Sequence, residues 1–95
     1  MNYIDAIARD IQKHTGADDG SGDLELYRYY ALLALTTGID TTNENVHDAW
    51  AAWTSSRRPG HKSLVPFATL APEVQALYQT YTDAIKAVVR GWFGL

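Results

Sequence analysis

The spacing of apolar residues most constrains how this chain can fold. They recur at intervals of three and four in four segments, and nowhere do they alternate with a period of two. Intervals of three and four place side chains on one face of a helix, whereas a half-buried strand alternates residue by residue. The pattern therefore predicts an all-α fold, a compact four-helix domain. The expected helices cover residues 3–14, 23–37, about 42–55 and 72–90.

Residues that favour helix ends stand near these boundaries. Asn2 is expected to cap the first helix and Ser21 or Asp23 the second, because short polar side chains accept hydrogen bonds from first-turn N–H groups. Thr41 and Glu44 have the spacing of a capping box ahead of the third helix. Pro72 suits the first turn of the fourth. Three glycines are expected to end the first, second and fourth helices: Gly16, Gly38 and Gly91.

The connections are also predictable from the residues. Residues 15–22 form an acidic, glycine-rich loop, and residues 56–63 form a basic loop that contains the turn signal Pro59-Gly60. We call residues 56–63 the basic loop. The segment Leu64-Val65-Pro66-Phe67 is expected to be extended, because a proline disfavours helical backbone at the residue before it.

Length and composition exclude several classes of protein. Ninety-five residues with 46% hydrophobic and 20% charged residues predict one domain, residues 1–95, with its own core. A net charge of −3 excludes a strongly basic nucleic-acid binder, and the absence of cysteine excludes disulfide scaffolds, thiol catalysis and cysteine zinc sites. No membrane span or secretory signal is found, so a cytoplasmic location is expected.

Charge is divided between the two halves of the chain. Residues 1–50 hold nine acidic and three basic residues, and residues 51–95 hold two acidic and five basic residues, so the halves carry −6 and +3. Two interpretations remain open. The division can create an acidic face and a basic binding site, or it can simply draw the two halves together.

The sequence offers little support for catalysis or metal binding. His47 and Asp48 are adjacent and diverge on a helix, no glycine-rich phosphate loop is present, and nothing orients the loop serines near His61. The acidic residues near Asp19 lack the glycine and glutamate spacing of a calcium loop, and His47 has no second ligand at helical spacing. We therefore expect no enzyme activity, no cofactor and no metal site.

Motifs in the second half of the chain resemble those of the ryanodine-receptor (RyR) repeat domain. They are a His-Asp-Ala-Trp-Ala helix at 47–51, a Lys-Ser-Leu-Val-Pro-Phe segment at 62–67, Leu70 and Glu73 before the last helix, and a closing Gly91-Trp92. The resemblance covers residues 46–94. The helix at 26–33 is also similar to one in small proteins of actinobacterial phages. This resemblance implies a non-catalytic nucleotide-binding module that works in the host cytoplasm if phage-encoded.

The resemblance and the residues together predict a ligand site around the basic loop. RyR repeats usually carry a turn with aromatic residues at the position of residues 54–61, and this chain has no aromatic residue there. Trp53 is therefore the expected stacking side chain; the alternative is that Trp53 packs in the core. Arginine and lysine can bind a phosphate, or the loop can simply be solvated. His47 is expected to anchor residues 64–67 or to contact the ligand. The candidate ligand-binding residues are Trp53, Arg57, Arg58, His61, Lys62 and His47.

A second hypothesis is a phage effector that binds a host protein through exposed aromatic side chains. Tyr29 cannot face the core together with Tyr27 and Tyr30, because successive helical residues point about 100° apart. The apolar tail is expected to fold back onto the third helix, as the closing aromatic of RyR repeats does, or to form an exposed patch. The candidate interface residues are Tyr29, Trp92 and Phe93. Pairing of RyR repeats also implies a homodimer.

Overall fold

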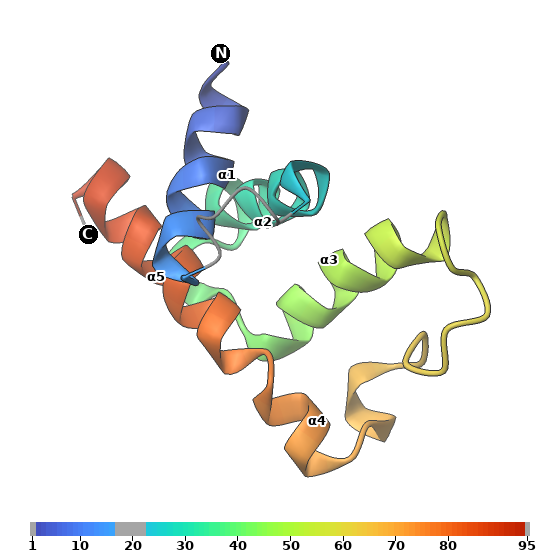
Figure 1. Cartoon of the computed structure of the whole chain (residues 1–95). Coiled ribbons are helices and arrows are strands. Elements are labelled where there is room, and N and C mark those ends of the chain that lie inside the picture. Colours follow the sequence, from blue (N-terminus) through green and yellow to red (C-terminus); the bar gives the residue numbers. More distant parts are fainter. Residues whose placement is uncertain (1, 17–22, 95) are drawn as a thin grey trace.

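The computed structural model describes residues 2–16 and 23–94, and within those residues it contains helices and no strands (Figure 1). The all-α prediction is confirmed. Most of the predicted acidic loop at 15–22 lies outside the described residues. In chain order the elements are α1 (Tyr3–His14), α2 (Leu24–Thr36), the 3₁₀ turn η1 (Gly38–Asp40), α3 (Asn43–Ser55), the 3₁₀ turn η2 (Phe67–Thr69), α4 (Pro72–Ala76) and α5 (Gln79–Phe93).

The core lies where α1, α2 and α5 pack on one another, and the start of α3 adds to it. Figure 1 shows these three helices grouped at one end of the molecule, while α3 leads away to the basic loop and α4. Apolar residues at helical spacing make this contact, as the sequence predicts. The buried apolar residues are Ile7, Ala8, Ile11, Tyr27, Tyr30, Ala31, Ala34, Val46, Ala84, Ile85, Val88 and Val89.

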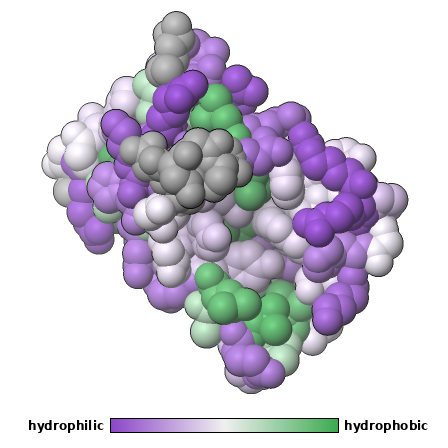
Figure 2. Space-filling model, viewed as in Figure 1, coloured by the Kyte–Doolittle hydropathy of each residue, from purple (hydrophilic) through white to green (hydrophobic). Residues whose placement is uncertain are grey.

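The other end of the molecule is built differently. No residue between Ser55 and Tyr81 is buried, although this stretch includes η2 and α4. Figure 2 shows hydrophobic side chains gathered at the edge of the surface where Figure 1 places α4. We call residues 56–78 the arm; its η2 and α4 pack on α3, and its partly buried Tyr78 packs against the core.

Helix starts agree with the prediction at three places and differ at a fourth; Pro72 is the first residue of α4, as predicted. Asn2 accepts a hydrogen bond from the Asp5 N–H, and Asp23 accepts one from the Glu25 N–H, so both predicted caps are confirmed. The predicted capping box of Thr41 and Glu44 is wrong, and the box is formed by Thr42 and Asn45. The hydroxyl of buried Thr41 instead donates to the Gly38 carbonyl in η1.

The predicted helix over residues 72–90 is interrupted in its first third and extends further at its end. Leu77 and Tyr78 form a turn between α4 and α5, so the prediction of one continuous helix is wrong. Gly91 lies inside α5, and the helix ends at Gly94, whose φ of 70° is the left-handed conformation that glycine adopts readily.

The C-terminal tail does not fold back onto the third helix. The indole N–H of Trp92 donates to the Asp10 carboxylate at 2.7 Å, which attaches the last turn of α5 to α1. The prediction of a tail on the third helix is therefore wrong, because tail residues 91–93 belong to the last turn of α5, which contacts α1. Within residues 2–16 and 23–94, no helix has both the length and the apolar character needed to cross a membrane.

Candidate functional site

A cavity of about 300 Å³ lies between α2, α3, the end of the basic loop and the junction of α4 and α5. We call it the aromatic pocket, because half of its lining residues carry aromatic rings. These are Tyr30, Trp50, Tyr78 and Tyr81, and the others are Leu26, Ser63, Val74 and Leu77. The volume is at the lower end of the range of about 300–1,000 Å³ for small-molecule sites. A cavity of this volume can hold one ring system of a ligand.

The walls of the aromatic pocket are uncharged. The rings of Tyr30 and Tyr81 lie 5.7 Å apart between centroids, and those of Trp50 and Tyr78 lie 6.5 Å apart. Burial raises the pKa of the Tyr30 and Tyr78 hydroxyls, so both phenols are neutral at physiological pH. Such walls favour the flat, neutral part of a ligand, and they disfavour a buried charge.

His47 fixes one wall of the aromatic pocket without lining it. Its Nε2 lies 2.8 Å from the Val65 carbonyl, which can only accept, so Nε2 carries a proton. In the neutral ring, Nδ1 therefore accepts from the Tyr78 hydroxyl at 2.9 Å. The side chain is 1% exposed and stacks on Trp50. The predicted anchoring of residues 64–67 by His47 is confirmed.

Arg57 is engaged by its own chain. One guanidinium nitrogen donates to the Glu25 carboxylate at 2.7 Å, and another donates to the Trp53 carbonyl at 3.2 Å. The guanidinium also lies 4.6 Å from the centre of the Trp53 ring, a cation–π arrangement. Arg57 therefore joins the basic loop to the first turn of α2, one residue before the pocket residue Leu26.

The remaining cations of the basic loop are exposed. In the part of the chain that the structure describes, the side chains of Arg58 and Lys62 make no hydrogen bond or ion pair, and Lys62 directly precedes the pocket residue Ser63. His61 accepts a hydrogen bond from the Ser63 N–H, and its ring lies edge-on to Trp50 at 5.1 Å. His61 thus attaches the loop to the pocket wall.

Trp53 occupies a different place from the one expected. Arg57 covers one face of its half-buried ring, and its indole nitrogen is buried with no hydrogen-bond partner among the described residues. Trp50 is the tryptophan that lines the aromatic pocket. The sequence favoured Trp53 as the stacking side chain, and the candidate ligand-binding residues predicted from it include none of Trp50, Tyr30, Tyr78 and Tyr81. The recurrence of Leu26, Tyr30 and Leu33 at intervals of four and three was a signal in the sequence for a second apolar face on this helix.

The candidate interface residues differ in exposure. Trp92 and Phe93 are 43% and 50% exposed at the end of α5, whereas Tyr29 is half-buried. The two C-terminal aromatic side chains therefore keep an accessible surface even though the Trp92 indole is hydrogen-bonded to α1.

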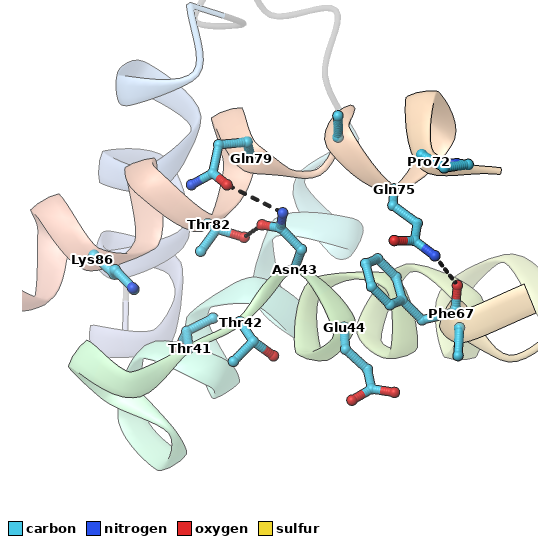
Figure 3. Close-up of a pocket in the computed structure, with 12 residues that line it drawn as sticks. Thr41, Thr42, Asn43, Glu44, Phe67, Pro72, Gln75, Gln79, Thr82 and Lys86 are labelled. Carbon is cyan, nitrogen blue, oxygen red and sulfur yellow. Dashed lines mark hydrogen bonds between the residues drawn. The ribbon is translucent and has the colours of Figure 1, made fainter. Parts of the chain in front are cut away.

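A second, larger groove of about 930 Å³ lies beside the start of α3, with α4 and α5 along it (Figure 3). Figure 3 shows that its polar side chains bond to one another. Asn43 accepts from Thr82 and donates to Gln79, and Gln75 donates to the Phe67 carbonyl. The first two contacts hold the start of α5 against α3, and the third holds α4 against η2. Among the described residues, no cluster of three or more potential metal ligands is found.

The comparison with protein families gives one match. The model of the domain of unknown function DUF7701 matches residues 2–90, nearly the whole chain. The chain belongs to this family. No curated protein and no solved structure matches the DUF7701 chain. The resemblance to RyR repeats stays a prediction, because the family description makes no reference to them.

Proposed function

We propose that this DUF7701 domain is a non-catalytic module that binds a small anionic molecule carrying a flat ring, of the kind derived from nucleotides. The observation that carries this proposal is the aromatic pocket beside the basic loop. The neutral aromatic walls include the last residue of a loop that carries exposed cations, and a nucleotide has the matching two parts.

The ring of the ligand enters the aromatic pocket. Trp50 and Tyr81 come from different helices, so a planar group between the walls meets π faces or edges from more than one side. Aromatic side chains that stack on bases contribute about 1–3 kcal/mol per base in single-strand binders. A volume near 300 Å³ limits the inserted part to one ring system.

The anionic part of the ligand stays outside the aromatic pocket, near the basic loop. Arg58 and Lys62 are exposed there, and Ser63 connects the loop to the pocket lining. Charge-assisted hydrogen bonds from arginine and lysine to phosphate oxygens are among the stronger polar contacts. Keeping the charge at the surface avoids the cost of burying it between phenol rings.

The motifs shared with RyR repeats support the same proposal and suggest its setting. A phage-encoded protein of this kind would act in the cytoplasm of its bacterial host, where it would sequester a signalling nucleotide. RyR repeats often pair, so two copies of the chain would form a homodimer with two aromatic pockets.

Thermal unfolding against a panel of nucleotides and matching nucleosides tests the proposal. A ligand at 100 times its Kd adds about 2.7 kcal/mol, which raises the midpoint by roughly 10–20 °C for a domain of this size. The double variant Arg58→Ala/Lys62→Ala should lose most of this shift. Arg9→Ala/Lys13→Ala removes two exposed cations from α1 and should keep it. No shift with any compound would show that the proposal is wrong.

The exposed aromatic end of α5 favours a second candidate function, binding of a host protein. Trp92 and Phe93 offer accessible rings, and aromatic residues are enriched where protein interfaces gain most of their binding energy. Under this proposal Trp92→Ala/Phe93→Ala abolishes host-protein binding and Arg58→Ala/Lys62→Ala does not. The reverse result would favour the small-molecule function.

A further inference from the structure

We propose that Glu25 is a built-in competitor for the anion of the ligand, and that only a phosphoryl group displaces it from Arg57. This inference rests on the proposed function, since it names the anion class and the arginine that the bound molecule recruits. It makes the Glu25–Arg57 ion pair an autoinhibitory contact beside the aromatic pocket.

The guanidinium of Arg57 is held in place by contacts that do not involve Glu25. It lies over the Trp53 ring and donates to the Trp53 carbonyl, both within one turn of its own backbone. If the carboxylate leaves, the cation therefore stays in nearly the same position. Arg57 is preorganised to receive a different anion, and the ordering cost of binding is reduced.

Glu25 is a weakly held partner. Its side chain is 52% exposed, and a single nitrogen–oxygen contact of 2.7 Å joins it to Arg57. Exposed ion pairs of this kind are worth about 1.5- to 5-fold in an equilibrium constant. A stronger anion can therefore take the guanidinium at a small cost.

The location of the pair connects it to the aromatic pocket. Leu26, the residue after Glu25, lines one side of the pocket, and Ser63 at the end of the basic loop lines another. Arg57 and Glu25 join these two sides. On this proposal, the anionic group of a ligand whose ring fills the pocket meets this ion pair at the pocket's edge, with Arg58 as the next residue along the chain.

The identity of the resident anion sets the class of the incoming one. A carboxylate carries one negative charge and two oxygens. A phosphate monoester carries about −1.5 to −2 charges and three acceptor oxygens, which match the planar donors of arginine. A ligand carboxylate has the same charge and number of oxygens as the Glu25 carboxylate, so it would gain no stronger contact with Arg57. Glu25 therefore favours phosphorylated over carboxylated ligands.

Titration calorimetry of the full chain at fixed ionic strength tests this inference, with phenyl phosphate and benzoate as probes. Glu25→Gln removes the competing charge and should tighten the Kd for phenyl phosphate by about 1.5- to 5-fold. Glu44→Gln is the matched control, because Glu44 is also the second residue of its helix and exposed. It should leave the Kd within about 1.5-fold. Arg57→Ala should weaken phenyl phosphate binding about tenfold or more.

The outcomes separate this inference from the function on which it rests. If phenyl phosphate binds wild type, Glu25→Gln and Glu44→Gln equally, Glu25 does not compete and only the inference is overturned. If benzoate binds wild type as tightly as phenyl phosphate, the phosphoryl class is wrong. If neither probe binds wild type or Glu25→Gln, the proposed function and the inference fail together.

Discussion

The hydrogen bond between Tyr78 and His47 should be a main support of the arm that carries the aromatic pocket. The variant Tyr78→Phe keeps the ring and removes only the hydroxyl. It leaves Nδ1 of His47 without a donor, in a side chain that is 1% exposed. An unsatisfied buried polar group costs about 1–3 kcal/mol. A central value of about 2 kcal/mol lowers the melting midpoint by roughly 8–16 °C in a domain of this length.

Urea unfolding and a thermal scan at neutral pH measure this loss. Tyr81→Phe is the control, because Tyr81 lines the same pocket and its hydroxyl makes no hydrogen bond within the described ranges. It should change the free energy of unfolding by no more than about 0.5 kcal/mol. If the two variants lose the same stability, the hydrogen bond to His47 does not support the arm, and our reasoning about the pocket wall is refuted.

Three further predictions concern residues that lie outside the arm. The hydrogen-bonded Arg28 holds the pKa of Asp5 below its ordinary value, so the stability from this carboxylate is present at neutral pH and lost as pH falls below about 4. As the pH is lowered, the urea midpoint of Asp5→Asn should therefore decline less than that of wild type. Burial raises the pKa of Tyr30, so the stability from its neutral phenol is lost as pH rises above about 10, and Tyr30→Phe should resist alkaline unfolding better than wild type. Thr42→Ala removes the cap that accepts from the Asn45 N–H and should cost about 1 kcal/mol, while Thr42→Ser restores it in thermal scans.

Helix positions and the core were predictable because burial imposes a helical period on the sequence. Ile7 and Ile11, or Ile85 and Val88, recur at the spacing that a helix face requires. The break at Leu77–Tyr78 was not predictable in this way. The apolar period continues through it, and the contact that accompanies the break, Tyr78 to His47, joins residues 31 positions apart. Periodicity reports which residues share a face, and it carries no information about such distant contacts.

The candidate site was predictable in part for the same reason. The basic loop and the anchoring role of His47 follow from residue types and short spacings, and the structure places both beside the aromatic pocket. The choice between Trp50 and Trp53 depends on which side of α3 the arm covers, and no local pattern determines that. The pairing of Arg57 with Glu25 similarly joins two elements whose approach is set by the tertiary fold.

Because no residue between Ser55 and Tyr81 is buried, the free energy of local opening should differ between the core and the arm. Hydrogen exchange in α1, α2 and α5 requires opening of the core, whereas η2 and α4 can open locally at a lower free energy. The aromatic pocket spans both regions, because Tyr30 belongs to the core and Val74 to the arm. Occupation of the pocket would therefore stabilise the arm selectively, and the slow-exchanging region would expand from the core into α4.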